Sequence, residues 1–338
     1  MLGKQLAQYP VGDRVIAGRE GEETMRPGRG GVHLTASTAV VWLLPLGALL
    51  LAFATNGVTR SLSRQYLQGL IASLLITVAF AFLERVLPST GPRKRLPQAL
   101  LNIQAGIVLF VGVTVSGVLA GFVAAAIGHH LGMGWIDLKF WSKDNFPALA
   151  ATVLMSWLIT DFAFYWYHRS QHTFALLWQV HKFHHMDEQV SATTRLRDNV
   201  SDTLINIFFM AVPIALLFRF DPVATAKLST FLALANETIA VFIHSNIRLS
   251  LGWASALMVG PQLHRIHHSR LIQHRNRNFC VYFPIWDILF RTYYHPSRAE
   301  FPPTGIDEAR DVSSIREVVA LPLQGWWAIL CGWRQRHT

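Results

Sequence analysis

Nine of the 15 histidines in this 338-residue chain occur in spacings that suit metal binding. The first pattern is His168-Arg-Ser-Gln-His172, whose i, i+4 spacing places both imidazoles on one face of a helix. Two patterns of the form His-x-x-His-His begin at His181 and His264, and His244 stands alone between them. The nine candidate ligands are His168, His172, His181, His184, His185, His244, His264, His267 and His268.

The two triplets have a spacing that predicts contact with more than one metal ion. In each, the first and fourth residues are expected to share a helix face, while the adjacent last histidine points to a neighbouring flank. Nine imidazoles are too many for one ion, because a site that keeps a position open for chemistry uses about three to five ligands. The sequence therefore predicts two metal ions.

The ligand type restricts the metal but does not fix it. Imidazole suits iron, zinc, copper and nickel. The chain contains no Glu-x-x-His motif of the soluble di-iron bundles and no His-Glu-x-x-His motif of zinc hydrolases. An all-nitrogen site leaves iron, zinc and copper open.

Two carboxylates precede histidines by two helical turns. Asp161 lies seven residues before His168, and Glu237 lies seven residues before His244. Each is predicted to bond a ligand's ring and fix its tautomer. The alternative for each is a packing carboxylate bonded to a nearby hydroxyl. The cysteines Cys280 and Cys331 match no metal spacing, and His274, in a basic insert, is left outside the ligand set.

The elements that must position these histidines have the composition of membrane helices. Hydrophobic residues make up 51% of the chain and charged residues only 15%, against about 25% charged in a typical soluble chain. Spanning a bilayer takes roughly 20 mostly apolar residues. The third apolar run fits either one long tilted helix or a hairpin of two. The expected spans are 38–55, 66–87, 98–128, 146–167, 201–219 and 222–244.

Loop charges predict the orientation of these spans. The net charge of +10 comes from short basic clusters between apolar runs, which is the positive-inside pattern and argues against a nucleic-acid partner. With the amino terminus in the cytoplasm, the loops at 93–95, 169–197 and 265–298 are cytoplasmic. The expected fold is therefore all-α, a polytopic membrane helical bundle with a cytoplasmic histidine-rich helical cap.

The chain is expected to divide into four parts. Residues 1–36 are predicted to be a disordered cytoplasmic tail, and 37–144 to be membrane helices that precede the histidine patterns. Residues 145–300 form the expected catalytic domain. Residues 301–338 form a carboxyl-terminal interfacial segment, in which tryptophans among leucines at 315–333 suggest a helix at the headgroups.

The histidine patterns and their surroundings resemble the fatty acid hydroxylase/sterol desaturase superfamily. Asp161 to His172 looks like its first box, Trp178 to His185 like its second, and His264 to His268 like its third. His244-Ser-Asn246 corresponds to an isolated family histidine, and Asn278-Phe279 with 286–293 resembles the stretch after the third box. The resemblance covers about 145–295. Cys280 and Arg291 stand where the family usually has glycine, and Arg197-Asp198-Asn199 replaces a frequent His-Pro.

The resemblance implies an activity for which two Fe ions and O2 are needed. It implies a membrane-bound enzyme that oxidises a lipid C–H bond by hydroxylation, desaturation or ether cleavage, with no catalytic residue beyond the metal ligands. Asn278 joins Asp161 and Glu237 as an expected supporting residue. Aromatic residues near the boxes are candidates to line the path of a lipid arriving from the bilayer, or simply to pack helices, namely Phe162, Tyr165, Trp166 and Phe183.

The electrons are expected from a separate ferredoxin-, flavodoxin- or cytochrome-type donor. The chain carries no dinucleotide-binding glycine fingerprint and no cysteine cluster for iron–sulfur. Basic residues at 169–197 are candidates to dock an acidic donor, in particular Lys182, Arg195 and Arg197.

Two other functions compete with this interpretation. A membrane zinc hydrolase of amide or ester lipids would bind zinc and act without oxygen. A metal transporter or sensor would place ionisable residues along several spans, but the second and third spans carry essentially none in their middles. Sterol, fatty acyl, ether-lipid and carotenoid substrates share the same boxes, so the sequence does not choose among them.

Overall fold

The computed structural model describes residues 36–131, 136–137, 146–206, 209, 218–219, 222–307 and 312–337. The regular elements of this part of the chain are helices, apart from a two-residue parallel pairing of β1 (Ile136–Asp137) with β2 (Phe218–Arg219). The expected all-α class is confirmed for the described residues. The predicted tail at 1–36, apart from its last residue, and most of the predicted span 201–219 lie outside them.

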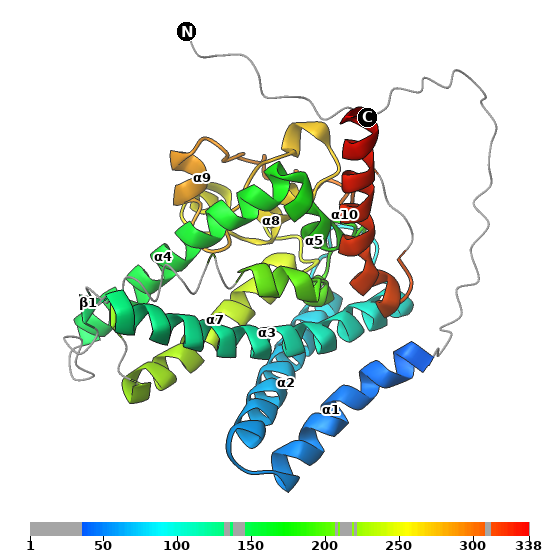
Figure 1. The fold of residues 1–338 in the computed structure, drawn as a ribbon. Helices are drawn as coiled ribbons and strands as arrows, with labels where there is room; N and C mark the ends of the chain where they lie inside the picture. The colour runs from blue at the N-terminus through cyan, green and yellow to red at the C-terminus, as the bar shows by residue number, and fades with distance from the viewer. Residues whose placement is uncertain are drawn as a thin grey trace. The chain divides into compact units, whose positions relative to one another are not determined.

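The amino-terminal helices follow the predicted apolar runs with shifted ends. α1 covers Ala36–Ala54, α2 covers Gly57–Val86 and α3 covers Leu96–Leu131 (Figure 1). α2 begins nine residues before the predicted 66, because apolar residues are not required for helix in its first turns. α3 is one continuous helix of 36 residues, so the long-helix alternative for the third run is the one that the chain adopts.

The helices that carry the histidines follow. α4 (Phe146–Thr173) continues beyond the predicted 167 through the whole first box. α5 (Ala175–His185) starts after the extended residue Phe174 and contains the second box, and α7 (Pro222–His244) begins at its proline and ends at its histidine. Between them, η2 (Ala192–Leu196) is a short 3₁₀ turn.

The remainder of the chain consists of short elements and one long helix. α8 (Pro261–His267) carries the third box, with Pro261 in its first turn. The short elements η3 (Gly252–Ala256), η4 (Ile272–His274) and α9 (Ile285–Leu289) lie before and after α8 in the sequence. α10 (Ile315–His337) packs against α5, where the Trp326 indole donates to the Leu176 carbonyl at 2.8 Å.

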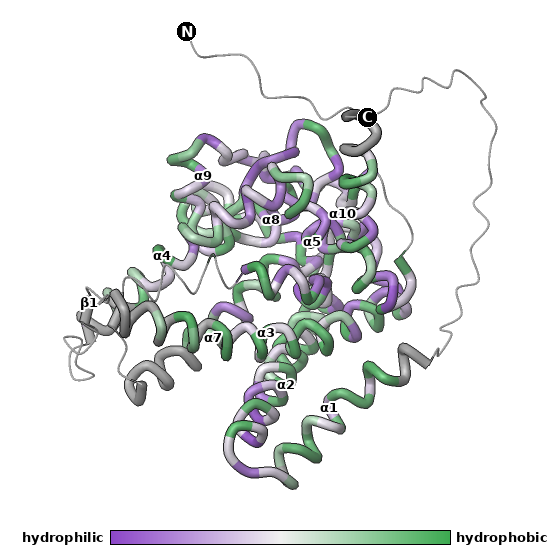
Figure 2. The backbone as a smooth tube through the Cα atoms, viewed as in Figure 1, coloured by the Kyte–Doolittle hydropathy of each residue, from purple (hydrophilic) through white to green (hydrophobic). Residues whose placement is uncertain are grey.

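The apolar surface is distributed unevenly over these helices. The segments Gly57–Val86 and Leu96–Leu119 are long and apolar enough to cross a membrane. α2 exposes a stripe of large apolar side chains that recurs every three or four residues, at Ile71, Leu75, Val78, Phe82 and Val86. Figure 2 shows apolar positions along α1, α2 and α3, and hydrophilic positions concentrated around α5 and α8.

Candidate metal centre

The nine predicted histidines meet in two groups of ring nitrogens. The five-histidine cluster consists of His168 and His172 from α4, His181 and His185 from α5, and His267 from α8. The four-histidine cluster consists of His184 from α5, His244 at the end of α7, and His264 with His268 at the end of α8. Within each cluster the potential ligand atoms all lie within 4.8 Å of one another.

Each triplet contributes to both clusters, but not in the predicted pairing. His181 and His185 share one cluster while His184 joins the other, and the third box repeats this division with the clusters exchanged. The prediction that each triplet reaches two sites agrees with this division, but the expected common helix face of the first and fourth residues does not place them in one cluster. Residues four apart are offset by only about 40° around a helix, whereas the residue three along is offset by about 60° in the opposite sense, so the first and last members converge.

The imidazoles approach one another through their Nε2 atoms. In the five-histidine cluster, His181 Nε2 lies 3.0 Å from His168 Nε2 and 3.1 Å from His185 Nε2. In the four-histidine cluster, His244 Nε2 lies 3.0 Å from His184 Nε2 and 2.9 Å from His264 Nε2. Such convergence of one atom type is the arrangement of ligands around a common centre.

Backbone carbonyls fix the tautomers of four of these rings. The Nδ1 atoms of His168, His184, His244 and His267 donate to the carbonyls of Phe279, Arg197, Ala240 and Arg277, at 2.7, 3.2, 2.6 and 2.8 Å respectively. In a neutral imidazole with a proton on Nδ1, Nε2 carries a lone pair and no proton. His184 and His244 therefore direct two lone pairs at each other across 3.0 Å.

Facing lone pairs repel, so this arrangement needs a cation between them. The buried Nε2 atoms of His172 and His267 likewise find no hydrogen-bond partner among the described residues. Buried polar atoms are otherwise almost always paired. The residues present therefore fit bound metal ions, and carbonyl-oriented histidines are the usual support of such ligands.

Burial also keeps the rings in the form that ligates metal. Desolvation lowers the pKa of His184 to about 3 and that of His267 to about 4. The pKa of His185 is lowered well below its ordinary value, first by desolvation and then by the neighbouring His268. The imidazoles are neutral at physiological pH, with lone pairs free for coordination.

Asp161 supports the five-histidine cluster, but not through a histidine ring as predicted. Its carboxylate accepts the backbone N–H groups of Val281, Tyr282 and Phe283 at 3.0, 3.2 and 2.9 Å. Asp287, which the sequence did not single out, accepts the N–H groups of Phe279 and Cys280, both at 2.9 Å. The two carboxylates thus hold the 279–283 backbone, whose Phe279 carbonyl orients His168.

Asn278 occupies the left-handed region, with a φ of 57° that asparagine tolerates better than most residues. Its side chain accepts the Tyr294 N–H at 2.8 Å, and its own N–H donates to the Thr292 carbonyl at 3.1 Å. It therefore braces the segment that presents the Phe279 carbonyl, one step removed from the ligands.

Glu237 does not bond His244, and the packing alternative describes it better. Its carboxylate accepts the Ser73 hydroxyl of α2 and pairs with Arg195 at 3.0 Å. Arg195 also lies 3.5 Å from Asp198, whose other oxygen is 3.4 Å from His184 Nδ1. Glu237 thus reaches the four-histidine cluster only through Arg195 and Asp198.

Asp198 is a neighbour of both clusters that sequence reasoning missed. Besides its approach to His184, it lies with Asp202 and His181 in a group whose potential ligand atoms are within 4.8 Å of one another. Burial raises the pKa of Asp198 to about 6. The only signal in the sequence was its place in the Arg-Asp-Asn run after the second box.

The basic residues expected to dock a donor are not all at the surface. Arg197 is buried, donates from Nε to the Phe183 carbonyl at 2.9 Å and stacks over the Phe183 ring at 4.1 Å. Arg195 is engaged by Glu237 and Asp198. Arg197 therefore braces the second box from inside, and the docking of an acidic donor on the 169–197 loop stays a prediction.

The predicted aromatic lining divides into interior and surface residues. Tyr165 and Phe183 are fully buried, and the Tyr165 hydroxyl lies 3.0 Å from the Thr292 hydroxyl. Phe162 and Trp166 are exposed on α4 and contact Phe290, with ring centroids 6.4 and 4.9 Å away. Helix packing accounts for the buried pair.

His274 lies outside both clusters, as expected. It is buried, with Nδ1 2.9 Å from the Ser269 hydroxyl and Nε2 3.0 Å from Glu300. The His274 ring therefore connects the basic insert to Glu300, and it belongs to neither histidine cluster.

Comparison with known proteins agrees with the geometry. Residues 153–292 match the family described as "Fatty acid hydroxylase", a range that includes every histidine of both clusters. No solved structure matches the chain.

Several curated relatives resemble the same region. An "Ornithine lipid hydroxylase OlsE" of Rhizobium tropici is 30% identical over 195 residues, which are 54% of this chain and 56% of the relative. An "Alkylglycerol monooxygenase" of Danio rerio is 31% identical over 160 residues, 46% of this chain and 34% of the relative. A "Very-long-chain aldehyde decarbonylase GL1-5" of Oryza sativa subsp. indica is 25% identical over 173 residues, 47% of this chain and 25% of the relative.

The chain spans about half the length of the first of these relatives and less of the others. The match nevertheless covers all three histidine boxes and the isolated histidine between them. The resemblance to the fatty acid hydroxylase/sterol desaturase superfamily that the sequence predicted is therefore confirmed for residues 153–292.

Proposed function

We propose that this protein is a membrane-bound, O2-dependent oxidoreductase that oxidises a C–H bond of a lipid with two iron ions. The five- and four-histidine clusters would each hold one ion through His168, His172, His181, His185 and His267, and through His184, His244, His264 and His268. The observation that carries the proposal is the convergence of nine imidazoles in two clusters, in which His184 and His244 direct their lone pairs at each other.

The spacing of the nitrogens supports iron over tetrahedral zinc. Two ligands at right angles and ~2.1 Å from one ion lie roughly 3.0 Å apart, whereas tetrahedral ligands at that bond length lie roughly 3.4 Å apart. The neighbouring Nε2 atoms of both clusters are separated by 2.9 to 3.1 Å. Five nitrogens in one cluster also exceed what a tetrahedral site accepts.

The lipid substrate follows from the helices that surround the clusters. We infer that α2 and α3 cross the membrane, since α2 leaves most of its apolar window exposed. α7 contacts α2 and delivers His244 from its last turn. Several spans would therefore converge on a histidine-rich cap at the cytoplasmic face. The relatives named for ornithine lipids and alkylglycerols fit a lipid substrate but do not choose its class.

Bound iron would supply O2 activation and removal of hydrogen from an unactivated C–H bond. The chain's own residues orient the rings through the carbonyls of Phe279, Arg197, Ala240 and Arg277. Phe279 excludes water from the five-histidine cluster, with its ring 5.3 Å from His172 and 5.7 Å from both His168 and His267. Such a preorganised, apolar surrounding is what the protein contributes to cofactor chemistry.

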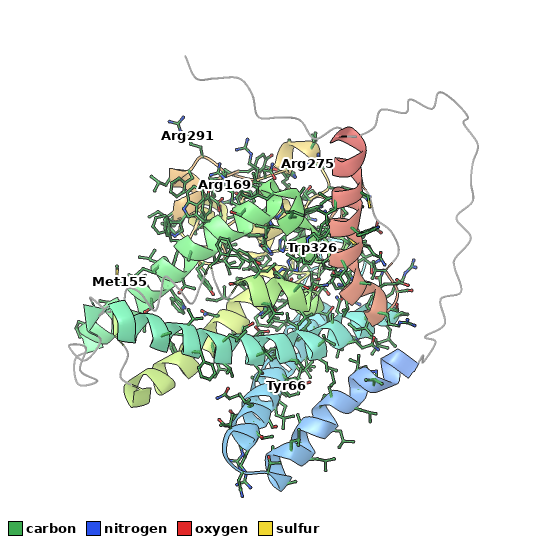
Figure 3. The ribbon with its side chains drawn as sticks, viewed as in Figure 1. Tyr66, Met155, Arg169, Arg275, Arg291 and Trp326 are labelled. Atoms are coloured by element: carbon green, nitrogen blue, oxygen red, sulfur yellow. The ribbon has the colours of Figure 1, made fainter. Side chains whose placement is uncertain are left out.

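The electrons would come from a separate acidic donor that docks on the basic insert after the third box. Arg277 belongs to this insert, and its carbonyl accepts the His267 Nδ1–H at 2.8 Å. Its guanidinium donates to the Arg291 carbonyl at 3.2 Å, near the protein surface. Figure 3 shows Arg275 and Arg291 at the same edge, with Arg291 directed outward. A donor bound there would be separated from a ligand by one short hydrogen-bonded path.

Lipid profiling with isotopic oxygen tests the proposed activity. Cells that express the parental protein, His184→Ala or the surface control His295→Ala would be grown with ¹⁸O2, and their lipids analysed by mass spectrometry. We expect one lipid class to gain ¹⁸O, or to lose two hydrogens, with the parental protein and with His295→Ala but not with His184→Ala. A lipid change that persists without oxygen, with zinc in the purified protein, would establish the hydrolase instead.

A further inference from the structure

An open cavity of about 350 Å³ lies beside the third box. Its wall includes residues 90–92, in the loop between α2 and α3, together with Arg265, Arg270 and Thr304. Arg265 follows His264 on α8 and is turned about 100° around the helix from it. The cavity therefore faces a different side of α8 from the one that carries His264.

Arg265 has an unusual environment for an arginine. It is 8% exposed, and its Nε donates to the Pro302 carbonyl at 2.8 Å. Among the described residues, no ion pair or hydrogen bond engages its terminal nitrogens. A Cβ at Gly91 would lie 3.6 Å from Arg265 Nη2, so the guanidinium fork faces the 90–92 wall. A largely buried guanidinium normally has an anionic partner, because burial of an unpaired charge is costly.

A second polar group in the wall also lacks a partner. Thr304 is 2% exposed, and its buried hydroxyl bonds nothing within the described part of the chain. At the rim, Arg270 is paired with Glu188 at 3.6 Å, with both side chains partly in solvent. An exposed pair at this separation contributes little and is readily exchanged for a stronger ligand.

The chemistry of this wall suits a phosphate or carboxylate group. Arginine binds either in a bidentate manner, and a threonine hydroxyl can donate to the same anion. The cavity is within the range of small-ligand sites, and Phe301 supplies an apolar side to it. Glu188 places one acceptor at the rim, which disfavours highly charged anions.

The position of the cavity identifies the source of the anion. Its 90–92 wall joins two helices that are each long and apolar enough to cross a membrane, α2 ending at Val86 and α3 beginning at Leu96. A loop between two spans lies at the level of the lipid headgroups. We propose that this cavity binds the anionic phosphate or carboxylate of a membrane-lipid headgroup. The proposal rests on the membrane placement and the lipid substrate proposed above.

Binding of soluble short-chain probes to the full chain in detergent tests this site. The probes would be dihexanoyl phosphatidylglycerol, dihexanoylglycerol, which lacks the anion, and inorganic phosphate. We expect the phosphatidylglycerol probe to bind, with affinity lowered about tenfold or more by Arg265→Gln and several-fold by Thr304→Val. Arg275→Gln, an exposed arginine outside the cavity wall, should leave the affinity unchanged.

Each other outcome decides against the site or its ligand. Equal affinity of Arg265→Gln and Arg275→Gln would overturn the site. Inorganic phosphate that binds as tightly as phosphatidylglycerol would show a free-anion site and overturn the headgroup assignment. If Arg265→Gln does not fold, because Arg265 also holds the Pro302 carbonyl, then Thr304→Val and Arg270→Gln carry the test. If neither of these two variants lowers the affinity for the phosphatidylglycerol probe, the proposal is overturned.

The iron content separates this proposal from the proposed activity. A double variant His184→Ala/His268→Ala removes ligands of one cluster without touching the cavity wall, so it should retain phosphatidylglycerol binding while its iron content falls. Arg265→Gln should retain its iron. In the parental protein, headgroup binding without iron would remove the proposed two-iron activity and leave the cavity proposal standing. Iron without headgroup binding in the parental protein would remove the cavity proposal alone.

Discussion

His184 and His185 are consecutive in the chain, yet their imidazoles belong to different clusters, with ring centroids 5.6 Å apart and planes inclined by 78°. α5 therefore lies between the two groups of nitrogens and contributes to both. α8 does the same with His267 and His268, whose ring centroids are 5.5 Å apart and whose planes are inclined by 89°. Two short helices thus divide nine imidazoles into five and four.

This division makes the effect of a double substitution depend on which cluster it affects. His184→Ala/His268→Ala removes two of the four ligands from one cluster, so about one iron per chain should remain. His184→Ala/His185→Ala removes one ligand from each cluster and should weaken both ions, leaving well under one iron after dialysis against a chelator. Metal analysis of the purified variants measures their iron content. Equal iron content in the two double variants would contradict the assignment of the histidines to two clusters.

The carboxylate of Asp161 is expected to stabilise the fold more than its single charge suggests. Asp161→Asn keeps one acceptor but turns an N–H₂ group toward backbone donors, so we expect a loss on the order of 2–4 kcal/mol. The thermal midpoint in detergent measures it, with Asp307→Asn as the control because Asp307 is exposed and only weakly paired. A midpoint for Asp161→Asn equal to that of Asp307→Asn would show that the 281–283 contacts are dispensable.

The pH dependence of the metal-free protein follows from the buried histidines. The folded-state pKa values of His184 and His267, about 3 and about 4, lie below the ordinary value of about 6.5. Below about pH 6.5 the unfolded chain binds more protons, so stability is complete above that pH and falls as the pH drops toward the folded values. Each such histidine contributes up to about 1.4 kcal/mol per pH unit.

The thermal midpoint of chelator-treated protein should therefore fall steeply between pH 7 and pH 5. Bound metal competes with the protons and should flatten this dependence. Replacement of the exposed His295 should leave the slope unchanged, whereas His267→Ala should reduce it. A metal-free midpoint that is constant over this range would contradict the burial of neutral rings.

The proposed docking of an acidic donor gives a prediction about surface charge. Arg275→Glu/Arg291→Glu should raise the KM for a reduced plant-type ferredoxin, used as a probe donor, roughly tenfold at low salt. Arg85→Glu/Arg95→Glu makes the same change in net charge at exposed sites on α2 and in the loop after it. The control should leave the KM near its parental value. If both double variants raise the KM equally, only the net charge of the protein affects donor binding, and the proposed docking site is contradicted.

The histidine ligand set was predictable because its signal is local. The spacings at His168, His181 and His264 place rings on helix faces whatever the rest of the fold, and the structure brings all nine together. The helical character of 38–55, 98–128 and 222–244 was equally readable from apolar runs. The division of the nine histidines between two clusters could not be read from the sequence, because it depends on the angle at which α5 and α8 approach each other.

The roles of the carboxylates could not be read from spacing. Seven-residue separation placed Asp161 on the face of His168, but its partners are N–H groups 120 and more residues later. The Glu237 carboxylate accepts a hydrogen bond from the Ser73 hydroxyl, which belongs to a helix far earlier in the chain. A carboxylate that caps backbone donors has no periodic signature, so no role was predicted for Asp287. No role was predicted for Asp198 either, because its contacts with Arg195 and His184 depend on the fold of the segment after the second box.

Metal analysis combined with Mössbauer spectroscopy of ⁵⁷Fe-enriched, purified full-length protein tests the two-iron centre most directly. We expect about two irons per chain, with the iron signal altered in His184→Ala and in His185→Ala and unchanged in His295→Ala. Stoichiometric zinc in place of iron, or iron that stays fully bound when both histidines are replaced, would contradict the proposed centre.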